Sequence, residues 1–292
     1  MNTNSKKGPD RRAVITHRDA PLLHFLWKWK MTTTSAIAAK FYPNLALWTA
    51  YKRLWVLEKA GYIRARCDET QSYCLWALNK RGFAFVKARM PKMREEGYLS
   101  EYLVHDALVS AVHLGDGLIE DSSGLEFFSE QELRRLHPND FPEWVPKNMF
   151  HRSDGFWRLM NESGQQVIAL EVELTSKCDD DYEMVGRFYG GETKVAMVLW
   201  IVSGARFAEK IHRLTSRVSR GQTKHAFVEL DAIYSKGWQA SISFGQKSGK
   251  TIAEVLGKCL PSSSQVHGTH LMLDGRKSPQ NTKFCGLLGG PR

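Results

Sequence analysis

The stretch Thr32–Leu78 constrains the fold of this chain more than any other. The hydroxyl-bearing residues Thr34–Ser35 can cap a helix that begins there, because a side-chain oxygen accepts a hydrogen bond from a free backbone N–H. Pro43–Asn44 then interrupts the chain. Apolar residues recur at three- and four-residue spacing over Leu47–Leu57, and Gly61 follows as a helix stop. This pattern predicts two helices separated by a turn.

An alternating segment with a polar tip at Asp68–Gln71 comes next and ends at Tyr73–Leu78. Alternation on both sides of such a tip predicts a two-stranded hairpin. Helix, turn, helix and hairpin in this order predict a winged helix-turn-helix. Residues 20–30, with Pro21 near the start, are expected to form the first helix of the same domain.

Four residues of the second helix lie mostly off its apolar stripe and are the candidate groove contacts: Trp48, Thr49, Lys52 and Arg53. On that face they could meet phosphates and base edges in a major groove. Arg64 and Arg66 begin the predicted wing and are expected to grip phosphates. The alternative is an amphipathic helix pair whose basic face is merely solvated.

The distribution of charge supports the first of these interpretations. The chain has a formal net charge of +10 over 292 residues. Residues 1–97 hold 19 Lys and Arg against 7 Asp and Glu, whereas the remainder holds 22 against 24. The basic excess therefore coincides with the predicted winged domain, as a phosphate-binding module requires.

Composition and pattern together predict four regions. Residues 1–19 are expected to form a flexible basic arm, residues 20–97 the winged helix domain, residues 98–244 an α/β domain and residues 245–292 a basic, mostly irregular tail. Helical spacing over residues 100–114 opens the second domain, and His105 and His113 within it are expected to line a helix face. The length leaves room for two domains of ordinary size.

The second domain alternates between strand and helix patterns, which predicts a mixed α/β sheet. Val195–Val202 is a continuous apolar run, typical of a strand covered on both faces. The other expected strands are 117–119, 125–128, 154–159, 167–174 and 226–230, and the expected helices are 129–136, 182–189, 207–218 and 251–260.

Three carboxylates form the main candidate catalytic group: Asp154, Glu171 and Glu173. Residues 171 and 173 share one face of a strand, because side chains alternate along it, and Asp154 lies at the start of the preceding strand. Converging carboxylates can bind Mg²⁺ or Mn²⁺, which prefer oxygen ligands. A metal held in this way could activate water for phosphodiester hydrolysis.

Asp154-Gly155, a turn, and then Ala169–Leu174 with Lys177 resemble the core of the restriction-endonuclease-like fold, the PD-(D/E)xK superfamily. With the predicted winged helix in front, residues 30–202 resemble the replication-relaxation family of plasmid and mobile-element proteins. The resemblance implies a nuclease-like second domain and a role in plasmid replication, relaxation or transfer. It also implies double-stranded DNA and other replication or transfer proteins as partners.

Glu173 stands where that superfamily has a lysine, and Lys177 is the candidate replacement. Three alternatives follow for the carboxylates: a Mg²⁺-dependent DNA endonuclease, a degenerate site in a binding module, or plain ion pairs. As ion pairs, Glu173 could face Lys177 or Arg187, and Asp154 could face a nearby arginine, Arg152 or Arg158. A winged-helix transcriptional regulator, whose second domain senses a ligand or dimerises, is a further alternative.

The remaining sequence features concern the cellular compartment, membrane association and oligomeric state. The five cysteines form no CxxC pair and no His/Cys cluster with zinc spacing, which favours reduced thiols in a cytoplasm. No run approaches 18 apolar residues, so no membrane span is expected. Winged helices often bind DNA as dimers, and a homodimer is compatible with the sequence.

Overall fold

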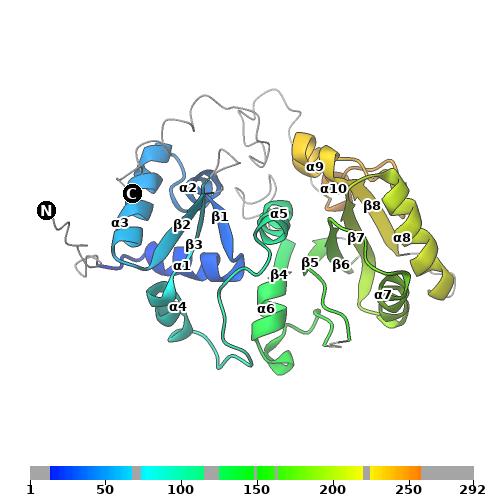
Figure 1. Ribbon diagram of the computed structural model, residues 1–292, viewed down its shortest axis with the longest axis horizontal. Helices are drawn as coiled ribbons and strands as arrows, with labels where there is room; N and C mark the ends of the chain where they lie inside the picture. Colours follow the sequence, from blue (N-terminus) through cyan, green and yellow to red (C-terminus); the bar gives the residue numbers. More distant parts are fainter. Residues whose placement is uncertain are drawn as a thin grey trace, which may run out of the picture. The chain divides into compact units, whose positions relative to one another are not determined.

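The computed structural model describes residues 14–67, 74–114, 125–147, 150–161, 164–219 and 224–257 (Figure 1). Most of the predicted basic arm, the predicted wing tip, the predicted strand 117–119 and the tail from residue 258 lie outside these residues. Within them the chain forms two compact units. Unit 1 comprises the described residues up to 92 together with 96–110, and unit 2 comprises 93–95 and the described residues from 111 to 257.

Unit 1 consists of short helices and a three-stranded antiparallel sheet whose strand order is β1-β3-β2. The elements in chain order are α1 (Asp19–Lys28), β1 (Met31–Thr33), α2 (Thr34–Phe41), α3 (Leu47–Lys59), β2 (Ile63–Cys67), β3 (Cys74–Leu78), α4 (Lys80–Lys87) and α5 (Leu103–Leu114), whose last residues belong to unit 2. The two helices separated by a turn and the following hairpin correspond to the predicted order of elements.

Local chemistry explains where the central elements of unit 1 begin and end. Thr33 caps α2, its hydroxyl accepting from the Ala36 N–H at 3.2 Å, one residue earlier than predicted. Asn44 has φ 64° in the turn between α2 and α3, a conformation that asparagine tolerates. Gly61, with φ 78°, follows α3 as predicted. The three-residue strand β1 was not predicted, because so short a segment carries no periodicity.

The first part of α5 packs into unit 1 through polar contacts as well as apolar ones. The buried Lys30 ammonium pairs with the buried Asp106 carboxylate at 2.9 Å. The Ser110 hydroxyl donates to the Met31 carbonyl at 3.0 Å. Since both contacts span more than 70 residues of chain, they join the N-terminal helices to a segment that the sequence assigned to the next domain.

Unit 2 is built on a six-stranded mixed sheet of order β4-β5-β6-β7-β8-β9, so the predicted α/β class with a mixed sheet is confirmed. β6, β7 and β8 are parallel, and the other neighbours are antiparallel. The strands are β4 (Leu125–Ser129), β5 (Gly155–Asn161), β6 (Gly164–Glu173), β7 (Val195–Val202), β8 (His225–Glu229) and β9 (Phe244–Gly245). The helices are α6 (Glu130–Arg135), α7 (Asp179–Gly191), α8 (Ala205–Val218), α9 (Leu230–Lys236) and α10 (Ile252–Val255), with short 3-10 turns at Pro138–Asp140 and Gly237–Gln239.

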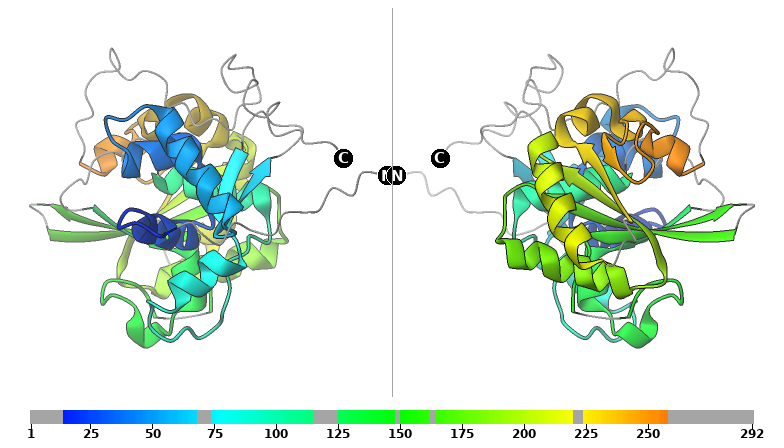
Figure 2. Two further views of the ribbon diagram at one scale, coloured as in Figure 1. Left: turned by 90° about the vertical axis from the view of Figure 1, so that its left-hand side faces the viewer. Right: turned by 90° about the vertical axis from the view of Figure 1, so that its right-hand side faces the viewer.

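The parallel strands are connected by α7 and α8, which lie side by side on one face of the sheet (Figure 2). The two helices approach closely at Gly186, where an added Cβ would lie 2.8 Å from the Thr215 Cα. The predicted apolar run Val195–Val202 is β7 in full, and all but one of its residues are buried. Among the described residues no helix is both long and apolar enough to span a membrane.

Candidate functional site

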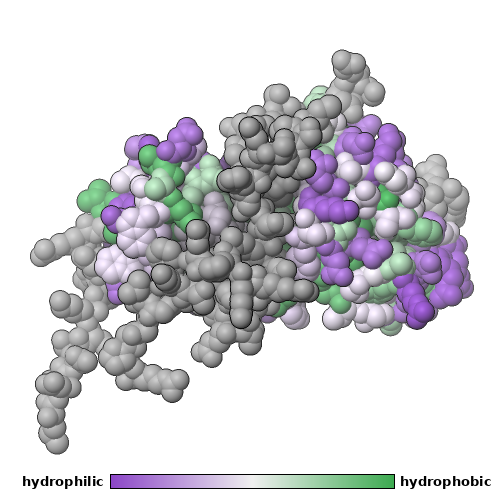
Figure 3. Space-filling view, turned by 90° about the horizontal axis from the view of Figure 1, so that it is seen from above, coloured by the Kyte–Doolittle hydropathy of each residue, from purple (hydrophilic) through white to green (hydrophobic). Residues whose placement is uncertain are grey.

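The outer face of α3 combines aromatic and basic residues. Trp48 and Trp55 expose 45% and 44% of their surface, and Lys52 and Lys59 are exposed between and beyond them. Positions 48, 52, 55 and 59 fall on one side of a helix, because 3.6 residues complete a turn. Leu47 and Thr49, in the first turn of α3, are exposed as well. Figure 3 shows apolar and polar side chains interspersed on the surface of unit 1, at the left of the view.

The two lysines are positioned against the two indoles. The Lys52 Nζ lies 5.4 Å from the centroid of the Trp48 ring, and the Lys59 Nζ lies 5.3 Å from that of Trp55. Such cation–π contacts are worth about 0.5–1 kcal/mol at exposed sites. They order the face without neutralising its charge. We call these four residues the Trp/Lys stripe.

Trp48 is supported from beneath by aromatic residues. Its ring stacks on Tyr51, with centroids 5.2 Å apart and an interplanar angle of 16°. Tyr51 in turn meets the edge of the buried Trp76, whose Nε1–H donates to the Thr34 hydroxyl at 2.8 Å. The exposed indole is therefore connected to the core of unit 1 through a row of rings.

The structure places Arg53 elsewhere than the sequence predicted. Its guanidinium forms two hydrogen bonds with the carboxylate of Asp19, which is fully buried, and a third with the Val14 carbonyl at 2.8 Å. Arg53 thus joins α3 to α1, and we do not count it among the candidate DNA contacts. Trp48, Thr49 and Lys52, the other three predicted contacts on α3, are exposed.

Arg64 and Arg66 lie two residues apart on β2 and are half-buried. Burial, together with the neighbouring charge of Arg64, lowers the pKa of Arg66. The Arg64 Nε is shielded from solvent and has no hydrogen-bond partner among the described residues. Two neighbouring guanidinium groups concentrate positive charge on this strand, and a phosphate that reached them would be attracted.

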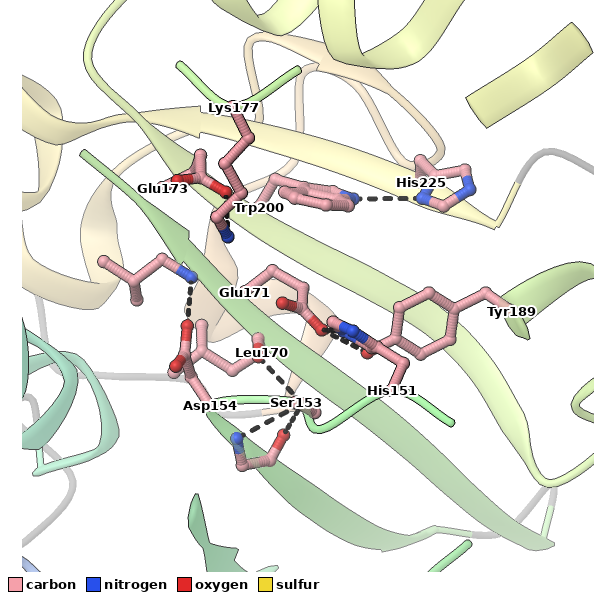
Figure 4. A network of polar contacts seen from close by, with 12 residues as sticks. His151, Ser153, Asp154, Leu170, Glu171, Glu173, Lys177, Tyr189, Trp200 and His225 are labelled. Carbon is pink, nitrogen blue, oxygen red and sulfur yellow. Dashed lines mark hydrogen bonds and ion pairs between the residues drawn. The ribbon is translucent and has the colours of Figure 1, made fainter. Parts of the chain in front are cut away.

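In unit 2, Asp154 is the residue before β5, and its groups are engaged by the neighbouring strand and helix. Its Oδ2 accepts from the Val172 N–H at 2.7 Å, and its own N–H donates to the Leu170 carbonyl at 3.0 Å (Figure 4). The Asp154 carbonyl accepts from the His113 Nε2 at 3.0 Å, since the other ring nitrogen of His113 accepts from Trp157. His113 is therefore a buried residue that positions the backbone of Asp154.

Glu171, on β6, is buried and holds two partners on one oxygen. Its Oε1 accepts from the Tyr189 hydroxyl and lies 2.7 Å from the His151 Nε2. Burial by itself lowers the pKa of His151, but attraction to Glu171 outweighs it, so the pKa is raised. Burial and the adjacent Glu171 carboxylate raise the pKa of Tyr189 well above its usual range. His151 and Tyr189 therefore meet at one oxygen of Glu171, and protonation of His151 would make its contact with Glu171 an ion pair.

Glu173 is buried on the same strand and pairs with the Lys177 ammonium at 2.7 Å. Burial raises the pKa of Glu173, although the Lys177 contact opposes that shift. Burial lowers the pKa of Lys177, but attraction to Glu173, Glu171 and Asp154 outweighs it and the pKa is raised. In Figure 4 the Lys177 side chain extends past Glu173 toward the other two carboxylates. One lysine thus acts electrostatically on all three acids.

Each of the three carboxylates is engaged by a protein group. Among the described residues, no group of three or more His, Cys, Asp or Glu side chains is arranged to hold a metal ion. A protein donor contacts one oxygen of each carboxylate: the Val172 N–H on Asp154, the Tyr189 hydroxyl on Glu171 and the Lys177 ammonium on Glu173. We derive no metal-dependent step from this site.

The other predicted ion pairs resolve differently. The Arg158 guanidinium pairs with the Glu126 carboxylate, and the Arg152 guanidinium lies 3.7 Å from the Glu130 carboxylate. Neither arginine therefore forms the predicted ion pair with Asp154. Arg187 pairs with Glu183 on its own helix rather than with Glu173. The expected pairing of Glu173 with Lys177 is present.

Sequence reasoning missed two members of the Glu171 cluster, His151 and Tyr189. They lie 20 residues before and 18 residues after Glu171 and belong to a loop and to α7. The helical spacing of Tyr182 and Tyr189 was the only signal, because it placed both rings on the face of α7 that packs on the sheet. Nothing in the sequence pointed to His151.

The chain matches no model of a known protein family, no curated protein and no solved structure.

Proposed function

We propose that this protein binds duplex DNA through a winged helix-turn-helix in unit 1. α2 and α3 are the two helices of the motif, and the antiparallel ribbon β2–β3 is its wing. The observation that carries the proposal is the outer face of α3, which presents exposed lysines and no exposed carboxylate. Glu58, the one acid of α3, is half-buried and accepts from the Ala65 N–H at 2.9 Å.

The docking model assigns a role to each exposed group. α3 lies in the major groove with Trp48 and Thr49, in its first turn, near base edges, as is usual for the second helix of such motifs. Lys52 contacts phosphate or base, and Arg64 and Arg66 bind phosphates from the wing. The excess of positive charge in residues 1–97 supports this placement, because backbone contacts supply most non-specific affinity.

For unit 2 we propose a nuclease-like sheet whose site does not cleave DNA and which serves binding or assembly. The support is that protein groups already engage two of the acids: His151 and Tyr189 hold Glu171, and Lys177 pairs with Glu173. On the resemblance described above, the biological setting is replication, relaxation or transfer of a plasmid or mobile element. Other replication or transfer proteins would then be its partners.

Lys52→Ala tests the docking model. The variant should bind a duplex more weakly, and the log–log slope of affinity against salt should decrease by about one unit, the value for one lost phosphate contact. Lys236→Ala is the matched control, since Lys236 is an exposed helical lysine of unit 2. Fluorescence anisotropy over a salt series measures both quantities. Unchanged affinity and slope in Lys52→Ala would remove the model.

A further inference from the structure

The outer face of α3 has few groups that can read a base by hydrogen bonding. Adenine is read by Asn or Gln and cytosine by a carboxylate, and neither kind of group is exposed on this helix. Its arginine, Arg53, is held by Asp19. The exposed donors are Thr49, Lys52 and Lys59.

The same face is rich in apolar surface instead. Leu47, Trp48 and Trp55 are each between 44% and 47% exposed. In the major groove the apolar surface of such side chains can contact the thymine C5-methyl, which is the apolar group displayed there. Trp48 and Trp55 are seven residues apart, about 10 Å along a helix. That distance matches about three base steps of duplex DNA.

Both indoles are ordered before any ligand arrives. Trp48 is stacked on Tyr51, and Trp55 carries the Lys59 ammonium over its ring. Side chains that are already held lose less conformational freedom on binding, so their contacts contribute more to affinity. The lysines of the Trp/Lys stripe lie beside the indoles, where each can reach a phosphate that flanks the contacted base.

We infer that the Trp/Lys stripe recognises thymine-rich duplex DNA, with Trp48 and Trp55 contacting thymine methyl groups and Lys52 and Lys59 contacting the adjacent phosphates. This inference rests on the proposed function and adds two residues to it, Trp55 and Lys59. It also assigns a chemical basis for sequence preference: the protein senses a methyl group rather than a hydrogen-bond pattern.

The test changes the DNA before it changes the protein. Two duplexes of about two helical turns, composed of A·T pairs, differ only in that one carries deoxyuridine in place of thymidine. The substitution removes the methyl and keeps the base pairing. Each lost methyl contact should weaken binding roughly fourfold, so the full-length protein should bind the thymidine duplex about tenfold or more tightly than the deoxyuridine duplex.

Variants then assign the effect to the indoles. In Trp48→Ala/Trp55→Ala the ratio of the two affinities should decrease to about one, because both side chains are at the surface and the fold persists without them. Tyr102→Ala is the matched control, since Tyr102 is a 72% exposed aromatic residue outside α3, and it should keep the wild-type ratio. Circular dichroism on each variant confirms folding.

The outcomes distinguish a failure of thymine-methyl recognition from a failure of the proposed DNA binding. Equal affinity of the wild-type protein for both duplexes, with Lys52 still required, overturns methyl recognition and leaves DNA docking standing. A methyl preference that survives in the double tryptophan variant overturns the assignment to these residues. Tighter binding to the single strand than to either duplex overturns it in favour of base stacking on the indoles. No binding to any of these DNAs overturns the proposed function as well.

Discussion

Arg53, on α3, and Asp19, at the start of α1, form an ion pair across 34 residues of chain, and the Asp19 side chain is fully buried. Thr16 adds two hydrogen bonds to the same carboxylate, from its N–H at 2.6 Å and its hydroxyl at 2.7 Å. The helix proposed to contact DNA, α3, is therefore fixed to the rest of unit 1 through Arg53, which was predicted from the sequence to contact DNA.

Removing Arg53 should destabilise the fold. Arg53→Ala leaves the Asp19 carboxylate buried without its cation, and breaking such a pair costs about 3 kcal/mol or more in the free energy of unfolding. Lys52→Ala, one residue earlier on the exposed face, should change it by less than about 0.5 kcal/mol. Urea unfolding of the two variants measures the difference. Equal stabilities would show that the pair contributes nothing to the fold.

Acid should unfold unit 1 through the same carboxylate. Burial by itself raises the pKa of Asp19, but hydrogen bonds from Arg53 and Thr16 outweigh it, so its pKa is lowered in the folded protein. A depressed carboxyl pKa stabilises the fold above the unfolded value of about 3.9 and loses that contribution as pH falls through the folded value. Circular dichroism between about pH 5 and 2 should show a loss of structure. In Asp19→Asn the stability should depend less steeply on pH over that window, and an unchanged slope would contradict the assignment.

Two histidines of unit 2, His151 and His225, should titrate at clearly different pH values. The raised pKa of His151 places its titration above 6.5, whereas burial lowers the pKa of His225 to about 4. The His151–Glu171 pair should therefore stabilise unit 2 below about pH 6.5 and lose that contribution as pH rises through the folded pKa of His151. NMR titration of the imidazole signals measures both values. Glu171→Gln should move the pKa of His151 downward, and a value that stays in place would show that Glu171 is not the cause.

The Tyr189 hydroxyl should contribute measurably to the stability of unit 2. Tyr189→Phe removes a buried donor and leaves the Glu171 oxygen with one partner fewer, which costs about 1–3 kcal/mol. Tyr234→Phe, at a half-buried position on α9, is the control and should stay within about 0.5 kcal/mol of wild type. Thermal unfolding of both variants makes the comparison. A Tyr189→Phe variant as stable as the control would mean that the hydroxyl contributes little.

Plasmid DNA should remain intact when the purified protein is incubated with Mg²⁺ or Mn²⁺. The reason is that His151 and Tyr189 already hold Glu171, and that Glu173 is paired with Lys177. Agarose gel electrophoresis of supercoiled plasmid detects nicking and cutting. Cleavage that disappears in Asp154→Ala would establish the endonuclease alternative and refute the non-catalytic proposal for unit 2.

The predictable part of this structure was local. Helix spacing located α3, the apolar run Val195–Val202 located β7, and the strand-forming residues 167–174 located β6. Each of these signals lies within one turn or one strand of the residues it describes. The division of charge between residues 1–97 and the remainder was equally readable, since it needs only counting. The mixed α/β sheet followed from the order of these elements.

Pairings between distant residues were decided by tertiary structure. Arg53 was predicted to be an exposed contact with the DNA groove, but in the folded chain it forms an ion pair with Asp19 of α1. Glu171 was predicted to be a metal ligand, and in the folded chain a loop brings His151, and α7 brings Tyr189, to one of its oxygens. A side chain's own spacing determines which face of its helix or strand it occupies. The group that forms an ion pair or a hydrogen bond with that side chain comes from an element far away in the chain. Only the packing of the two elements brings the side chain and its partner together.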